Sequence, residues 1–160
     1  MEYEDIPLSN VDLQTFVKKF EKKGANIIED KNILPNTPIN EIFNNRGHAI
    51  VFHKYDNSQI GHWYALLQDT NKNVFMIDSF GEKPDKYCKN LIPCLKNNGI
   101  KSLTVNDLKM QKDNAICGRY CVVLCALHKL EQKVPKIYEF LTQGKKNSGS
   151  YDKFILDLTT

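Results

Sequence analysis

The stretch QKDNAICGRYCVVLCALHKL, residues 111–130, predicts the element around which the rest of the chain is built. Its apolar, cysteine-dotted part is expected to form a helix from about Cys117 to Lys133, ending before Pro135. Cys117 would then lie in the first turn, where unsatisfied backbone N–H groups and the helix dipole favour a thiolate. The thiolate is the attacking form of cysteine, so this position suits a nucleophile.

A structural role for the same sulfur stays open and, from this stretch alone, is favoured. Cys117, Cys121 and Cys125 are spaced i, i+4 and i+8, which places them on one face of a helix. Cysteine is among the most buried residue types, so all three thiols can be core residues. Gly118 fits either role, because it lets other backbone approach closely at the start of the helix.

Length and composition indicate one folded domain, residues 1–160. The chain has 160 residues, of which 41% are hydrophobic and 26% charged, and this balance is that of an ordinary globular protein. The apolar run Cys121–Leu127 is too short to cross a bilayer, so no membrane partner is expected. The acidic start, MEYEDIPLSN, has no apolar signal core, so no export is expected either.

The cysteine count and the net charge indicate which cellular compartment and which partners to expect. Five cysteines are an odd number without a secretory signal, which favours reduced thiols in an intracellular reducing compartment over a disulfide framework. The formal net charge of +3 is a mild excess. Only Arg46 and Arg119 are arginines, so at most a weak nucleic-acid contact is predicted.

Local patterns predict an α+β fold in which the helix carrying Cys117 packs on a small, mostly antiparallel sheet with flanking helices. Strand-like segments are expected at 49–55, 60–68, 74–80 and 102–107, the middle two forming a hairpin. An N-terminal helix capped by Ser9 or Asn10 would present Leu13, Phe16, Val17 and Phe20 and end at Gly24. The remaining segments are expected as a loop at 30–47, a helix at 86–99 broken by Pro93, a helix at 134–143, a flexible connector at 144–150 and a last apolar segment at 151–158.

The hairpin bears on the chemistry of Cys117 through its register. If the turn is centred on Thr70 or Asn71, His62 lies opposite Asp78 or one step diagonal to it, on the same face of the sheet. A carboxylate beside an imidazole fixes its tautomer and stabilises imidazolium. A two-residue turn at Asn71-Lys72 would instead put Asp78 on the other face. Without that pairing, His62 is a half-buried strand residue and Asp78 a turn residue.

Gln111 is a candidate oxyanion-hole donor. An acyl-transfer site needs donors aimed at the oxygen that becomes negative, and a side-chain amide together with the backbone N–H of Cys117 would supply two. By itself a glutamine six residues before a cysteine is equally well a solvated loop amide.

Taken together, His62-Trp63, then Asp78-Ser79-Phe80-Gly81, then Gln111 through Cys117-Gly118 resemble the adenain (adenovirus maturation protease) and Ulp/SENP group of cysteine proteases. The shared pattern is H-W, an acidic residue closing the next strand, and Q-x(5–6)-C-G opening a helix. The order and spacing agree across residues 62–121, while the N-terminal helix and the strand at 49–55 fit more loosely.

The resemblance implies a role for each of these residues. Cys117 would attack the scissile carbonyl, and His62 would be its base and later its acid. Asp78 would orient His62, and Gln111 would help hold the oxyanion. Trp63 and Gly118 would lie at the substrate, with Trp63 roofing a narrow channel that favours small residues before the cleaved bond. A large core aromatic is the competing interpretation of Trp63.

Two departures from the family refine the expected substrate. The acid is aspartate, as in the SUMO-protease branch, while D-S-F-G is closer to the E-P-F-G of the adenoviral branch. The chain also lacks extensions that would grip a ubiquitin-like protein. We therefore expect a monomeric viral or mobile-element maturation protease, as in virophages, that processes capsid or core precursors in the host cell and virion. No cofactor or metal is expected. Adenain is activated by a peptide and by DNA, but neither Cys88 nor Cys94 matches its peptide-linking cysteine.

Other classes of protein stay open. A deubiquitinating or deSUMOylating isopeptidase, or an acetyltransferase, would use the same three residues. A non-enzymatic, basic nucleic-acid-binding virion protein is supported only by the lysines. A zinc module does not fit the usual ligand spacings, whichever donors it draws from Cys88, Cys94, Cys117, Cys121 and His128.

Overall fold

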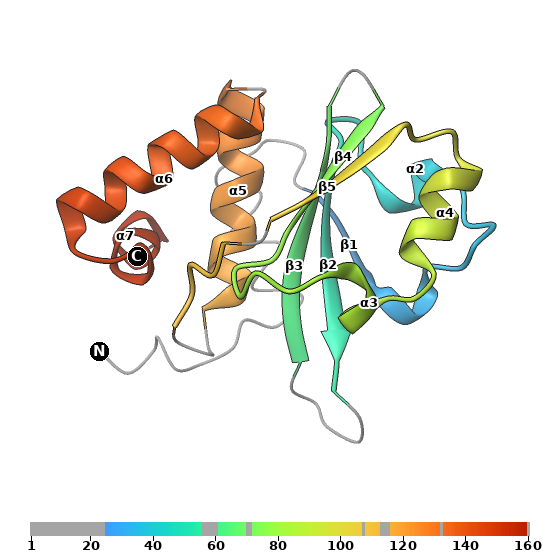
Figure 1. Ribbon diagram of the computed structural model, residues 1–160, viewed down its shortest axis with the longest axis horizontal. Coiled ribbons are helices and arrows are strands. Elements are labelled where there is room, and N and C mark those ends of the chain that lie inside the picture. Colours follow the sequence, from blue (N-terminus) through green and yellow to red (C-terminus); the bar gives the residue numbers. More distant parts are fainter. Residues whose placement is uncertain are drawn as a thin grey trace.

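The computed structural model describes residues 25–55, 61–69, 72–106, 108–112, 116–131 and 133–159, so the predicted N-terminal helix lies outside the described residues. The elements, shown in Figure 1, are β1 (Asn26–Glu29), the 3₁₀ turn η2 (Asp30–Asn32), α2 (Ile39–Ile42), β2 (His48–Lys54), β3 (Gly61–Gln68), β4 (Asn73–Ile77), α3 (Pro84–Tyr87), α4 (Leu91–Asn97), β5 (Ser102–Val105), α5 (Cys117–Glu131), α6 (Val134–Ser148) and α7 (Tyr151–Thr159).

The strands form a single mixed sheet in the order β1-β2-β3-β4-β5, which confirms the α+β class. Strands β2, β3 and β4 are antiparallel neighbours, and the two outer pairs, β1 with β2 and β4 with β5, are parallel. The parallel pairs arise where helices intervene between the strands, because a parallel neighbour needs a crossover connection. Here α2 follows β1, and α3 and α4 follow β4.

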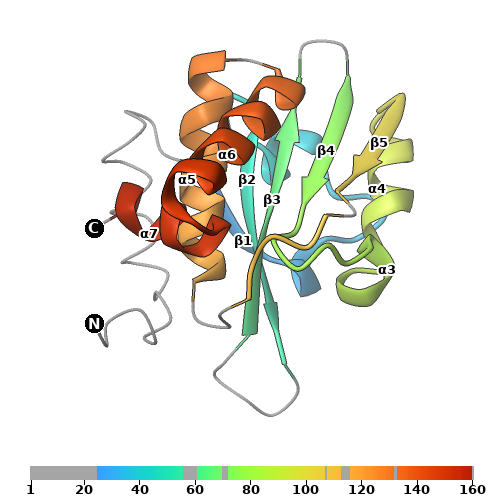
Figure 2. The same cartoon turned by 60° about the vertical axis from the view of Figure 1, so that its left-hand side comes forward.

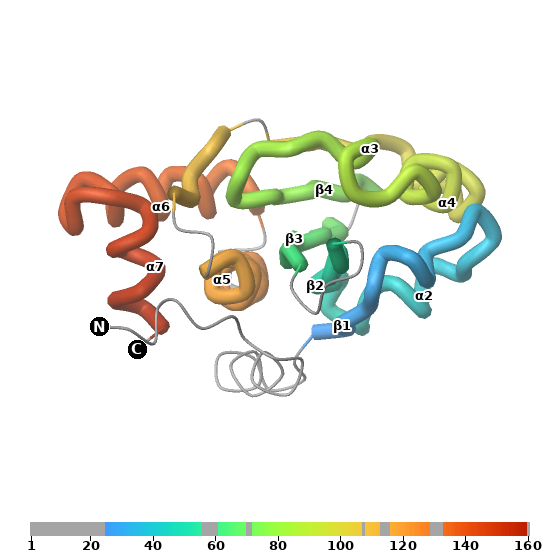
Figure 3. Tube along the Cα trace, turned by 90° about the horizontal axis from the view of Figure 1, so that it is seen from below, coloured from blue at the N-terminus to red at the C-terminus, as the bar shows by residue number. Residues whose placement is uncertain are grey.

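Helices cover both faces of the sheet. Figure 3 shows α5 on one side of β2 and β3, with α2, α3 and α4 on the other. Alternation along β3 divides the core accordingly: Trp63, Ala65 and Leu67 belong to the α5 side, and Tyr64 and Leu66 to the opposite side. The middle of the sheet is therefore buried on both faces, and the middle residues of β2 and β3 are hydrophobic.

The helix α5 is itself enclosed on the side away from the sheet. In Figure 2 α6 and α7 lie in front of α5, and both contact it. Because the helix is covered from two directions, its buried residues go round the helix instead of forming one stripe. Within the described part of the chain, none of the helices has both the length and the apolar character needed to span a membrane.

Three expectations about helices and loops are wrong. The segment 30–47, predicted as a loop, contains η2 and α2. The break predicted at Pro93 lies earlier, at residues 88–90, and Pro93 is the third residue of α4, where a helix has no use for the missing N–H. The connector predicted at 144–150 is helical as far as Ser148, and α6 ends on Gly149 with a positive φ of 100°. Gly144 serves packing: a Cβ there would lie 2.1 Å from the Phe154 ring of α7.

Candidate active site

Cys117 is the first residue of α5, as the sequence predicts. The carbonyl of Ile116 accepts hydrogen bonds from the N–H groups of Arg119 (3.1 Å) and Tyr120 (3.2 Å), so the helix begins at this point. The side chain is only 4% exposed, and its Sγ accepts a hydrogen bond from the backbone N–H of Trp63 at 3.4 Å. A backbone donor and the positive end of a helix therefore both meet this sulfur, and both stabilise negative charge on it.

The register of the β3–β4 hairpin brings His62 and Asp78 together. Ala65 pairs with Ile77 and Gln68 with Val74, which is the diagonal one of the two registers that place both residues on the same face. Asp78 follows directly after β4, and its Oδ1 is hydrogen-bonded to Nε2 of His62. Both side chains are almost completely buried.

The loop after β4 folds back around the carboxylate of Asp78. The backbone N–H of Phe80 donates to Oδ1 at 3.4 Å, and that of Glu82 donates to Oδ2 at 3.0 Å. The hydroxyl of Tyr87 donates to Oδ2 at 2.9 Å. Burial raises the pKa of Asp78, but the hydrogen bond and charge of His62 and these further donors outweigh burial, so that the pKa lies below its usual value. Asp78 is thus held as a carboxylate.

His62 is held as an imidazolium. Burial lowers its pKa, but hydrogen bonding with Asp78 and with Cys117, and the negative charge of both, raise it to about 9. Because Nε2 is bonded to Asp78, Nδ1 is the ring nitrogen left to face the thiol. The ring of Phe80 lies 4.9 Å from that of His62 and helps to enclose it. At neutral pH these residues favour a charged His62 ring beside the sulfur.

Gln111 is fully buried beside the same loop. Its Oε1 accepts a hydrogen bond from the hydroxyl of Ser79, which orients the amide. The backbone N–H groups of Gln111 (2.9 Å) and Met110 (2.8 Å) both donate to the carbonyl of Ser79. Nδ2 of Asn106 donates to the carbonyl of Asp78 at 3.0 Å. The chain before Cys117 is therefore attached to the loop that carries the acid.

Trp63 and Gly118 lie close to Cys117 in different ways. Because neighbouring strand residues point to opposite faces, the ring of Trp63 lies in the core on the α5 side, 4% exposed and 4.5 Å from the ring of Phe52. It is the backbone of Trp63 that contacts the sulfur. Gly118 is the buried second residue of α5. Burial favours the core interpretation of the indole in this conformation, and its predicted contact with substrate stays a prediction.

The other four cysteines are also buried, and none of them forms a disulfide. Burial raises the pKa of Cys121 well above its usual value and that of Cys88 to about 11. Burial raises the pKa of Cys94 as well. Thiols with a raised pKa stay protonated at neutral pH. Among the described residues no cluster of three or more histidine, cysteine, aspartate or glutamate side chains is arranged to hold a metal ion.

Several residues of the site had no sequence signal. Tyr87 reaches Asp78 from α3, nine positions along the chain. Asn106 reaches it from the segment after β5. Tyr87 donates to the carboxylate of Asp78 and Asn106 to its backbone carbonyl. Neither spacing matches a local motif, so only the folded chain brings these groups to Asp78.

No family model matches the chain, and a comparison with curated proteins finds no match. The resemblance to adenain and the Ulp/SENP proteases therefore rests on the residues between His62 and Cys121 and on their arrangement.

Proposed function

We propose that this chain is a cysteine endopeptidase in which Cys117 is the nucleophile, His62 the general base and acid, and Asp78 the residue that orients His62. The observation that carries the proposal is the continuous chain of contacts from the Asp78 carboxylate through the His62 ring to the Cys117 sulfur. A thiol that only fills space in a core needs no imidazole, and an imidazole that only fills space needs no buried carboxylate.

The proposed reaction has two halves. In the first, the Cys117 thiolate attacks the peptide carbonyl, a C–S bond forms and the oxygen becomes negative. His62 then gives its proton to the departing amine, the C–N bond breaks and an acyl-enzyme remains. In the second half, His62 takes a proton from water, the hydroxide attacks the thioester and the C–S bond breaks. The products are a carboxylic acid and the thiolate, and His62 is again protonated.

The proposed oxyanion donors are the backbone N–H of Cys117 and the side-chain amide of Gln111. The support for Gln111 is its orientation: because Ser79 donates to Oε1, the NH₂ group is the end of the amide that remains a donor. The first residue of α5 also has a backbone N–H without a partner inside the helix. Two such donors are what a tetrahedral intermediate requires.

The substrate class follows from the family resemblance. We propose a capsid or core precursor of a virus or mobile element, with small residues before the scissile bond. The buried position of Cys117 is in line with a narrow approach to the sulfur. The need for a free thiolate fits a reducing compartment of the host cell and, after assembly, the virion.

Labelling with iodoacetamide tests the nucleophile without any substrate. Cys117 is expected to react much faster at pH 7 than the other four cysteines, as followed residue by residue with mass spectrometry. Equal rates for all five thiols would contradict the proposal.

Co-expression with structural proteins of the same genome tests the activity. Bands that shift with the unaltered chain and not with Cys117→Ala would identify the substrate. Cys121→Ala, one helical turn further along the same face, is the matched control and should leave cleavage intact. Loss of cleavage in both variants, or in neither, would count against Cys117 as the nucleophile.

A further inference from the structure

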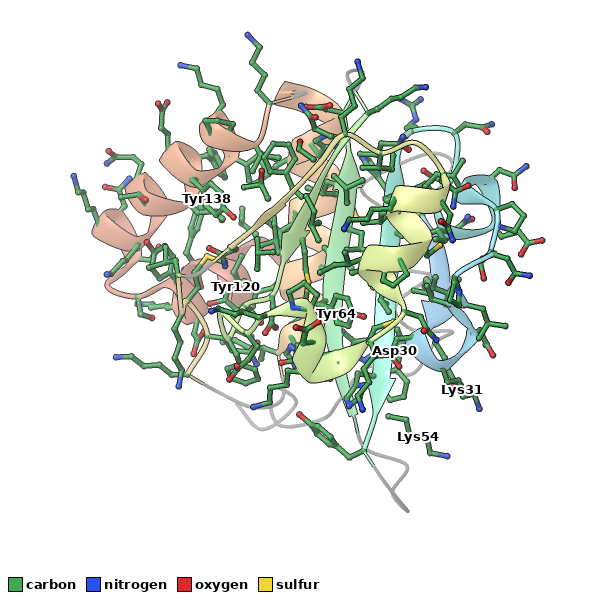
Figure 4. All side chains as sticks on the ribbon, turned by 45° about the vertical axis from the view of Figure 1, so that its right-hand side comes forward. Asp30, Lys31, Lys54, Tyr64, Tyr120 and Tyr138 are labelled. Carbon is green, nitrogen blue, oxygen red and sulfur yellow. The ribbon has the colours of Figure 1, made fainter. Side chains whose placement is uncertain are left out.

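Tyr87 is a buried aromatic residue against the His62–Asp78 pair. It is the last residue of α3, is 8% exposed, and belongs to the core on the side of the sheet opposite α5. Its ring stacks on Tyr64, with centroids 5.2 Å apart and an interplanar angle of 18°. On the same face it stacks on His62 at 5.3 Å and 29°. Figure 4 shows Tyr64 beneath α3, with Asp30 close by.

A second histidine also contacts the Tyr87 ring. His53 of β2 is the cross-strand partner of His62, and its ring centroid lies 5.1 Å from that of Tyr87. Nδ1 of His53 is bonded to Oδ2 of Asp30 at 2.7 Å, so it too is fixed by a carboxylate. The Tyr87 ring thus has two histidines as neighbours, and each histidine is tied to its own aspartate.

The hydroxyl of Tyr87 donates to Oδ2 of Asp78 at 2.9 Å. Burial, and then the charge of Asp78, raise the pKa of Tyr87 far above its usual value, so the group stays a donor wherever the protein is folded. Asp78 uses its other oxygen for His62, and Oδ2 also accepts a hydrogen bond from the N–H of Glu82. Two donors from separate parts of the loop therefore resist rotation of the carboxylate about its Cβ–Cγ bond.

The orientation of the Asp78 carboxylate determines whether the His62 ring keeps its hydrogen bond and its charge. A hydrogen bond weakens steeply as its angle departs from linear, and a buried imidazolium that loses its acceptor is strongly disfavoured. Tyr87→Phe would keep the ring stack and remove only the hydroxyl. The backbone N–H groups of Phe80 and Glu82 would remain as donors to the carboxylate. Without the hydroxyl, Asp78 would be held less firmly towards Nε2 of His62.

We propose that Tyr87 is a positioning residue of the active site, whose hydroxyl holds the Asp78 carboxylate in the orientation that supports the His62 imidazolium. This inference rests on the proposed function for its catalytic meaning. The juxtaposition itself, hydroxyl to carboxylate to imidazole, is a property of the fold.

Other titratable groups face the same two residues and need to be followed in any test. They come from β2, from the loop after β4 and from α5, and they are His53 with Asp30, Tyr55, Glu82 and Cys117.

The test compares Tyr87→Phe with the matched control Tyr64→Phe, which removes a hydroxyl from the same aromatic stack without touching Asp78. The first readout is the titration of the His62 ring by NMR. The chain has four histidines, and His62→Gln assigns the signal. We expect Tyr87→Phe to lower the pKa of His62 by about one unit, the equivalent of roughly a tenfold change in equilibrium, and Tyr64→Phe to leave it in place. The second readout is alkylation of Cys117 at pH 7, expected to be about tenfold slower in Tyr87→Phe.

A double-variant comparison isolates the path through Asp78. In an Asp78→Asn background, Tyr87→Phe should produce little further change in either readout, because the group it positions is gone. An unchanged His62 titration in Tyr87→Phe would overturn the inference. A rise in that pKa would overturn it too, since it would mean that the hydroxyl merely withdraws charge from Asp78. Slow alkylation of Cys117 in the unaltered chain would instead defeat the proposed function, while the NMR titration still decides the role of Tyr87.

Discussion

At its first residue α5 meets His62 of β3, and near its last turn it brings His128 against His48 of β2. At the first end the ring of His62 has a carboxylate and a thiol as partners. At the second end Nε2 of His48 is bonded to Nδ1 of His128 at 2.8 Å, and the two rings meet edge to face with centroids 5.0 Å apart. All three histidines are at most 6% exposed.

The two ends differ in the direction of their pKa shifts. Burial lowers the pKa of His128, the charge of His48 lowers it further, and it falls to about 4 in spite of the more distant Asp69. Burial acts in the same direction on His62, yet its anionic partners raise the pKa to about 9. Burial alone therefore does not decide whether a histidine is charged; the groups opposite the ring do. The histidine at the first end of α5, His62, is therefore charged at neutral pH, and the histidine near its last turn, His128, is neutral.

The largest expected difference between the two ends concerns the reactivity of Cys117. His62→Gln should slow alkylation of Cys117 by iodoacetamide at pH 7 by roughly 30-fold, because an unassisted cysteine is only a few per cent thiolate at neutral pH. His128→Gln, the same substitution at the other end, should leave the rate within about twofold of the unaltered chain. Both rates are measured by quenching the labelling reaction at a series of times and analysing the protein by mass spectrometry. Equal slowing in the two variants would mean that the reactivity reflects general stability of α5.

A smaller effect is expected in the acid stability of the protein. Since the folded state keeps His128 neutral down to about pH 4, the unfolded state binds more protons between about pH 4 and 6.5. Stability should therefore fall as the pH falls through this window. In His128→Gln the loss of melting temperature between pH 7.5 and pH 5 should be about 4 °C smaller than in the unaltered chain. The same loss of melting temperature in the two proteins would refute the neutral state of His128.

The smallest effect is expected in stability at alkaline pH, where the contribution of His62 is lost as the pH rises. A histidine with a raised pKa adds stability that is full below about pH 6.5 and is lost as the pH rises towards about 9. The measurement uses Cys117→Ser, which leaves Asp78 as the anionic partner of His62. In that background His62→Gln should reduce the drop in melting temperature between pH 7 and pH 9.5 by about 2 °C. A drop of unchanged size would indicate that Asp78 does not hold a charged ring.

The elements nearest the site were the most predictable from sequence. The start of α5 at Cys117 and the hairpin of β3 and β4 follow from apolar patterning and turn residues. The sequence left the register of the hairpin open, with His62 and Asp78 on one face for two of the turn positions considered. The structure has one of these two registers. Catalytic roles for these residues remain predictions, to be decided by the labelling and cleavage experiments.

The misplaced boundaries and the missed residues share a cause. Gly144 looked like a chain breaker, but contact with Phe154 makes it a packing residue inside α6. For Tyr87 the sequence predicts only a place in the helix at 86–99. The path of the chain after β4 brings its hydroxyl to Asp78. The roles of Gly144 and Tyr87 each depend on a contact with a residue in another element or loop. Local sequence patterns carry no information on such contacts.

What the sequence determined by itself is the helix and the strands that carry the site and the alternation of side chains along them, because helix and strand periodicity depend only on neighbours along the chain. Only the tertiary structure decided which buried histidine meets an acid and which meets another histidine, and therefore which of them is charged. The physical reason is that desolvation and Coulomb interactions depend on distances through space, and these exist only once the sheet and α5 have packed together.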